Sequence, residues 1–96
     1  MLDEALRRAT AQVGAGEFFE AHDTLEEEWH HIPDGELRIA VQGLIQVCAG
    51  LHKRSEGKAA GAKYLLERGV EKVQRCGRAL PSGAAAPFLE RARLPS

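Results

Sequence analysis

Residues 35–54 read GELRIAVQGLIQVCAGLHKR, in which apolar and polar residues follow the period of an α-helix. Apolar side chains recur three and four positions apart, which places them on one face of a helix. The members of this face are Leu37, Val41, Leu44, Ile45, Cys48 and Leu51, followed by His52. Asp34 precedes the stretch as a candidate N-cap, and Pro33 ends the segment before it. We therefore predict one long helix whose inward face ends in a histidine.

Three further stretches have the same helical period, and signals for β-strands are nearly absent. The expected helices cover about residues 3–13, 17–31 and 55–80, and a short last helix begins near Pro87. Asp3 and Ser55 are candidate N-caps, and glycine or proline residues separate the helices. Short connections favour antiparallel neighbours. We predict an all-α fold over residues 1–96: a compact single-domain bundle of four main helices and a short C-terminal helix.

The composition is that of an ordinary globular domain. The chain has 96 residues, of which 44% are hydrophobic and 28% are charged, with 13 Lys and Arg against 14 Asp and Glu. A net charge of −1 gives no general reason to bind nucleic acid, and no apolar run is long enough to cross a membrane. The acidic start Met1–Glu4 lacks the apolar part of a secretory signal, and two cysteines make no disulfide framework. We expect a cytoplasmic protein without membrane or nucleic-acid partners.

Charge is distributed unevenly along the chain. Between residues 17 and 36 there are eight acidic residues and no Lys or Arg. Between residues 53 and 78 there are eight basic residues against three acidic ones. The two segments fall on the second and fourth expected helices, which can pair with each other or with a second copy. A protein-interaction module that uses an acidic and a basic helix is therefore one functional alternative, and a homo-oligomer stays open.

Polar side chains interrupt the apolar faces of the second and third expected helices. His22 falls within the apolar row of the second helix, and Glu26 follows one turn later. His52 ends the apolar face of the third helix, on which Gln42 and Gln46 can complete hydrogen bonds. If the two helices pack antiparallel, His52 approaches the first half of the second helix. We therefore predict that a His/Glu/Gln cluster lies between these helices.

Three roles of this cluster stay open. In the first, Glu26 accepts a hydrogen bond from the ring of His22, and the polar cluster organises the core or holds a small ligand. In the second, His22, Glu26 and His52, with Cys48 as a further donor, bind zinc or another divalent metal, and a bound water suits a hydrolase. In the third, Glu26 tunes His22 for general acid–base catalysis. No recognised catalytic motif is present, so the sequence favours a protein without enzymatic activity.

Two glycines within the third expected helix need a reason, because each costs about 1 kcal/mol relative to alanine. Gly43 and Gly50 lie seven residues apart and therefore on the same side of the helix. We predict that another backbone approaches there, with room for a ligand as the alternative. Trp29 is expected to be an anchor of the core rather than a binding platform.

The segment FEAHDTLEEEW, residues 19–29, resembles the signature E-A-H-E-x-L-E-x-x-W of the family called domain of unknown function 309. QGLIQ at residues 42–46 and GAKYLL at residues 61–66 fit the family as well. The resemblance covers about residues 17–73 and implies a small all-α bacterial or archaeal protein with no assigned activity. Asp23 departs from the pattern, since glutamate is usual there. The positions that match are Glu20, His22, Glu26, Trp29, Gln42, Gly43, Gln46 and His52.

Overall fold

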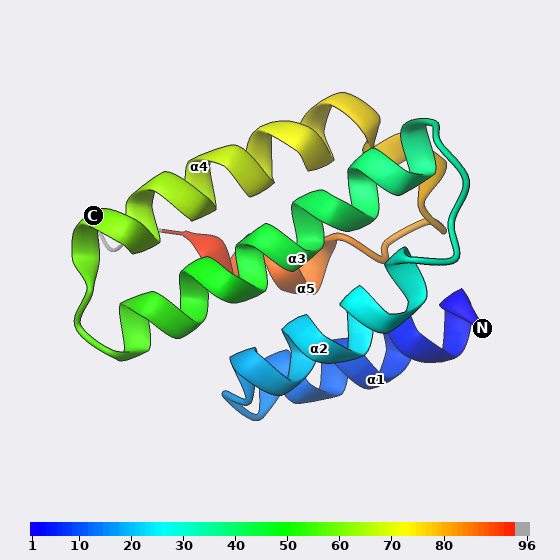
Figure 1. Cartoon of the computed structure of the whole chain (residues 1–96). Coiled ribbons are helices and arrows are strands. Elements are labelled where there is room, and N and C mark those ends of the chain that lie inside the picture. Colours follow the sequence, from blue (N-terminus) through cyan, green and yellow to red (C-terminus); the bar gives the residue numbers. More distant parts are fainter. Residues whose placement is uncertain (94–96) are drawn as a thin grey trace.

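The computed structural model describes residues 1–93 and folds them into five α-helices (Figure 1). The helices are α1 (Leu2–Gly14), α2 (Phe18–Trp29), α3 (Glu36–Ser55), α4 (Ala59–Cys76) and α5 (Ala86–Ala92), with a 3₁₀ turn, η1 (Gly77–Ala79), after α4. No part of residues 1–93 forms a strand. The predicted all-α fold, with four main helices and a short C-terminal one, is confirmed. Over the same residues, no helix combines the length and the apolar character needed to span a membrane.

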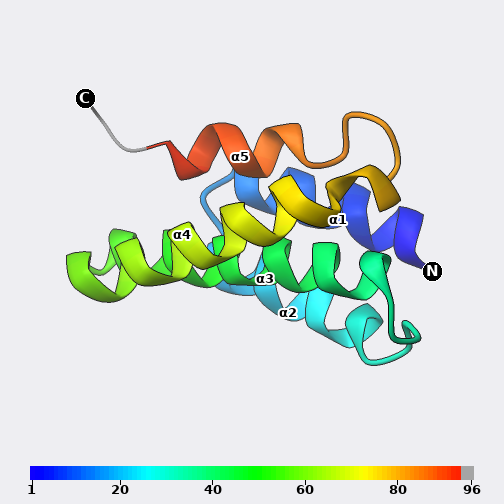
Figure 2. The same cartoon turned by 90° about the horizontal axis from the view of Figure 1, so that it is seen from above.

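α3 lies in the middle of the assembly. It packs most extensively against α4 and next against α2, and it also touches α5. In Figure 1 α3 runs between α2 and α4. Figure 2, seen from above, shows α5 on the opposite side of the molecule from α2. The largest fully buried side chains come mainly from α3: Phe88, Leu25, Leu44, Leu51, Val13, Val41, Val47 and Cys48. The apolar face predicted for this helix therefore forms the centre of the core. Burial of each large apolar side chain contributes about 1.5–3 kcal/mol to the stability of the fold.

Glycines bring the backbones of α3 and α4 into direct contact. A Cβ added at Gly43 would lie 2.8 Å from the carbonyl oxygen of Gly69, and one added at Gly69 would lie 2.6 Å from that of Gly43. One added at Gly50 would lie 2.8 Å from Cγ of Leu66. Any larger residue at these positions would push the helices apart. The predicted close approach of another backbone is confirmed, and no room for a ligand is left on this side of α3.

The predicted start of α4 is wrong. Ser55 is the last residue of α3, and its hydroxyl donates to the carbonyl of His52 at 2.6 Å instead of capping the next helix. α3 ends there because Gly57, with a φ of +78°, turns the chain in a conformation that favours glycine. Lys58 then takes the N-cap position, and α4 begins at Ala59.

The two predicted aspartate caps are also wrong. α1 begins at Leu2, before Asp3, and no side chain caps it. Gly35 occupies the N-cap of α3 with a φ of 147°, and the carboxylate of Asp34 instead lies 3.8 Å from Nε of Arg38. Both helices start without a side-chain cap because packing of their apolar faces, rather than local capping, stabilises them.

Candidate functional site

The first turns of α2 and the last turns of α3 meet at one surface of the molecule. The ring of Phe19 lies 6.0 Å from the ring of His22, nearly parallel to it, and 5.4 Å from the ring of His52, centroid to centroid. The antiparallel packing of α2 on α3 therefore brings both predicted histidines to the same aromatic side chain. Phe19 itself is 52% exposed, which is unusual in this chain for a large apolar residue.

Carboxylates accompany both histidines. Nδ1 of His22 lies 3.1 Å from Oδ1 of Asp23, and its Nε2 lies 3.8 Å from Oε2 of Glu26. Nε2 of His52 lies 3.5 Å from Oε2 of Glu56, the residue that follows the end of α3. The Glu26 side chain is 47% exposed and that of His22 is 23% exposed, so the carboxylate faces solvent. We call this group the Phe19 surface: Phe19, His22, Asp23, Glu26, His52 and Glu56.

The predicted glutamines lie apart from this surface. Gln42 accepts a hydrogen bond from Nζ of Lys72 at 3.2 Å, across the contact between α3 and α4. Gln46 has a buried Oε1 atom without a hydrogen-bond partner among residues 1–93. Glu20 is exposed on α2. The structure therefore brings His22, Glu26 and His52 to one surface but does not place the glutamines against the histidines.

Trp29 is half-buried and belongs to a different contact, where α2 leads into α3. Its Nε1 donates to the carbonyl of Arg38 at 3.0 Å, and the Arg38 guanidinium lies 3.9 Å from the centroid of the indole. The same guanidinium donates to the carbonyls of Trp29 at 3.0 Å and Ile32 at 2.6 Å. Trp29 and Arg38 thus fasten the connection between the helices, and Trp29 presents no open platform for a ligand.

The arrangement gives little support to the metal alternative. Within the described part of the chain, no three His, Cys, Asp or Glu side chains are grouped so that they could hold a metal ion. Cys48, considered as a further donor, is buried in the core, and burial raises its pKa to about 12. A thiol with such a pKa stays protonated near neutral pH, so it is a poor nucleophile. The Phe19 surface can stack, accept hydrogen bonds and attract cations.

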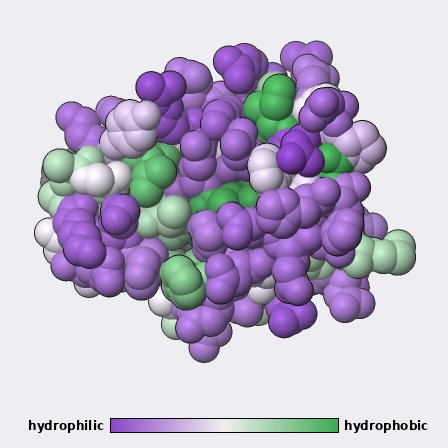
Figure 3. Space-filling view, viewed as in Figure 1, coloured by the Kyte–Doolittle hydropathy of each residue, from purple (hydrophilic) through white to green (hydrophobic). Residues whose placement is uncertain are grey.

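Acidic side chains are concentrated on α2, whereas basic side chains outnumber acidic ones on α4. The α2 carboxylates of Glu20, Asp23 and Glu26 have no Lys or Arg nitrogen within 4 Å among the residues described. α4 carries the basic residues, and on it the Arg68 guanidinium lies 5.1 Å from the centroid of the exposed Tyr64 ring. Figure 3 shows the face seen in Figure 1, where hydrophilic side chains cover most of the surface and apolar atoms are visible near its centre. The acidic surface of α2 is thus available to a partner.

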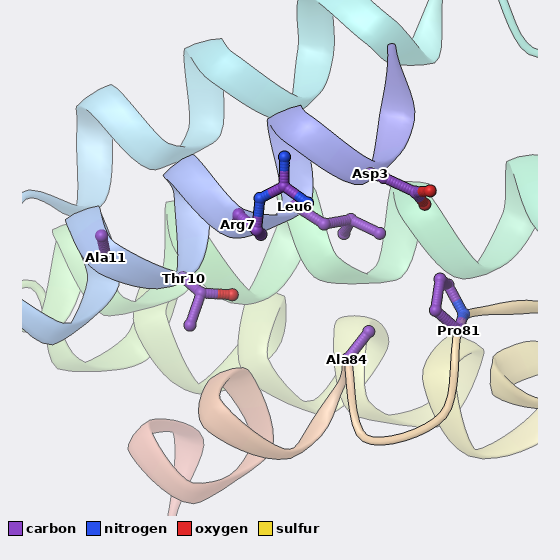
Figure 4. A pocket seen from close by; sticks show the side chains of 7 residues that line it. All are labelled: Asp3, Leu6, Arg7, Thr10, Ala11, Pro81 and Ala84. Carbon is purple, nitrogen blue, oxygen red and sulfur yellow. The ribbon is translucent and has the colours of Figure 1, made fainter.

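A pocket lies away from the Phe19 surface, between α1 and the segment that leads into α5 (Figure 4). Its volume is about 580 Å³, and it is lined by Asp3, Leu6, Arg7, Thr10, Ala11, Pro81 and Ala84. No sequence motif indicates this pocket, because its lining consists of small apolar residues and ordinary surface charges.

Comparison with known proteins assigns the chain to a family but not to an activity. The protein is similar to an uncharacterised protein of Aquifex aeolicus (strain VF5), with 27% identity over 73 residues. The match covers 76% of this chain but 22% of the Aquifex protein, so this chain spans about a fifth of the length of that relative. No solved structure matches the chain. The family described as "Domain of unknown function (DUF309)" matches residues 6–65, which is more than half of the 96 residues. The chain therefore belongs to the DUF309 family.

Proposed function

We propose that this protein is a binding module, and that its Phe19 surface receives a basic segment of another protein. The observation that carries the proposal is the environment of Phe19. This ring is half-exposed, it neighbours two histidine rings, and it stands beside α2 carboxylates that lack a Lys or Arg partner within residues 1–93. Aromatic and acidic groups that are left open together are complementary to arginine or lysine side chains.

An arginine of a partner suits this surface in two ways. Its guanidinium can stack on the face of Phe19, an interaction worth about 0.5–1 kcal/mol at an exposed site. It can also donate to the carboxylates of Asp23 and Glu26, which approach the opposite nitrogens of the His22 ring. Each contact is weak, and several along one basic segment are needed for measurable affinity.

Two further observations support the proposal. The Aquifex relative is several times longer than the region it shares with this chain, which fits a helical unit that works beside other domains. Cys48 and Cys76 are both free and buried, which fits a reducing compartment, and we propose a cytoplasmic location on this ground.

The test is a titration of ¹⁵N-labelled protein, followed by NMR, with an eight-residue peptide of alternating Arg and Gly. We expect chemical-shift changes at the start of α2 and the end of α3, and no binding of the matched Glu and Gly peptide. Phe19→Ala should weaken binding about threefold, because the stacking contact is lost. Tyr64→Ala, which removes the exposed aromatic ring of the basic helix, is the matched control and should leave the affinity unchanged.

The proposal fails if the Arg peptide binds Phe19→Ala as tightly as the wild-type protein. It also fails if shift changes spread over every acidic side chain of the molecule, which would indicate unspecific attraction that salt removes. A stoichiometric metal that the wild-type protein retains and His22→Ala loses would favour the metal alternative instead.

A further inference from the structure

The pocket exists because α1 and the segment that leads from η1 into α5 do not pack closely. α1 contacts α2 over most of its length but touches α5 far less. The side chains that face each other across the gap are small, with Thr10 and Ala11 on α1 and Pro81 and Ala84 on the opposite segment. Figure 4 shows Leu6 and Thr10 directed from α1 toward the segment that carries Pro81 and Ala84. The result is a cavity of about 580 Å³ that is open to solvent.

The lining of this pocket combines an apolar wall with a single cation. Leu6, Ala11, Pro81 and Ala84 supply apolar surface, and Arg7 is the only basic residue of the lining. No carboxylate of residues 1–93 lies within 4 Å of a nitrogen of the Arg7 guanidinium. An exposed arginine without an ion-pair partner at the rim of an apolar pocket is complementary to a ligand with one negative charge and an apolar body.

Asp3 restricts how such a ligand can lie. Its carboxylate is part of the same lining, one turn before Arg7 on α1, and Figure 4 places it toward Pro81 at one end of the pocket. A negative group is repelled at that end. It is attracted at Arg7, where the hydroxyl of Thr10 adds a hydrogen-bond donor on the next turn. The apolar body then lies along Leu6 and Ala84.

We propose that this pocket binds a small carboxylate with an apolar tail, of the class of medium-chain fatty acids. Pockets of about 300–1,000 Å³ with mostly apolar walls and few polar groups are typical of small-molecule sites, and this pocket falls within that range. Arg7 holds the carboxylate, and Leu6, Ala11, Pro81 and Ala84 cover the tail. The site is separate from the Phe19 surface, so its occupation neither requires nor excludes a basic partner.

The test compares two probes of the same shape, octanoate and the neutral octanamide, by isothermal titration calorimetry and by NMR shift mapping. We expect octanoate to bind about fivefold more tightly than octanamide, as is reasonable for one exposed ion pair. Arg7→Gln should remove this preference. Arg8→Gln, the neighbouring arginine outside the lining, should preserve it. Asp3→Asn should leave octanoate binding as strong or make it stronger.

A second pair of variants tests the apolar part of the site. Ala11 is exposed on α1, and Ala11→Leu fills the pocket with a residue that favours helix, so the fold should be kept. This variant should weaken both probes. Ala60→Leu, at an exposed position of α4 outside the lining of this pocket, should weaken neither.

Three results would overturn the proposal: equal affinity for octanoate and octanamide, an undiminished preference in Arg7→Gln, or no binding of octanoate at millimolar concentration. Shift changes confined to residues outside α1 and the segment 81–91 would overturn it as well. If Ala11→Leu bound both probes like the wild-type protein, the pocket would not be the place where they bind.

Discussion

The contact between α3 and α4 and the contact between α1 and the segment that leads into α5 represent opposite kinds of packing. At the first, Gly43 and Gly69 let the two backbones touch, and no space is left between them. At the second, small side chains face each other without closing the gap, and a pocket of about 580 Å³ remains. Small residues therefore do not by themselves bring two elements together. At Gly43 and Gly69 they do so because two helices carry glycines that face each other.

The packing of α5 against the core depends on one large side chain. Phe88 is fully buried, and it is the largest side chain that α5 places in the core. Phe88→Ala should lower the free energy of unfolding by about 3–5 kcal/mol, because it removes most of the apolar area that fixes α5. Chemical denaturation monitored by circular dichroism measures this loss. A loss below 1 kcal/mol would show that α5 contributes little to the fold.

The contact between α3 and α4 depends on the absence of a side chain at Gly69. Gly69→Ala should lower the free energy of unfolding by about 2–3 kcal/mol, since its Cβ would lie 2.6 Å from the carbonyl oxygen of Gly43. The gain in helix propensity offsets part of this cost. Gly14→Ala is the control, because nothing lies within 4 Å of an added Cβ there, and it should not destabilise the protein. Equal stability of the two variants would mean that the helices separate without cost.

The smallest expected effect concerns polar contacts at the end of α5. Nη2 of Arg54 donates to the carbonyl of Arg91 at 2.6 Å, and Nη1 donates to that of Arg93 at 3.1 Å. Arg54→Gln should lower the free energy of unfolding by about 0.5–1 kcal/mol, because the bonds are exposed to solvent. Arg68→Gln, which removes a guanidinium that lies over the exposed Tyr64 ring, is the control for loss of charge. If both variants melt alike, Arg54 does not hold α5 in place.

Much of the fold follows from local spacing. The recurrence of apolar residues in 35–54 predicts the central helix and its inward face, and Pro87 lies in the first turn of α5 as expected. The helix starts were predicted less well. Asp3, Asp34 and Ser55 are good capping residues by type, but none caps a helix in this chain. Capping is worth about 1 kcal/mol, and tertiary packing outweighs it.

Only part of the geometry of the candidate site could be predicted from the sequence. The antiparallel arrangement of α2 and α3 was enough to place His22 and His52 on one surface. The exposure of Glu26 and Phe19, and the bond of Gln42 to Lys72, could not be predicted, because they depend on the rotation of each helix about its axis and on α4. That rotation is set by contacts of many side chains at once.

The amino-acid sequence alone determines that this protein is helical and which faces of its helices are apolar. Each of these depends on residues that are close together in the chain, so the period of the helix is sufficient to predict them. Only the tertiary structure determines that α1 faces the segment of Pro81 and Ala84 across a pocket. The position of that segment relative to α1 depends on packing contacts across the whole core, which no local sequence pattern specifies.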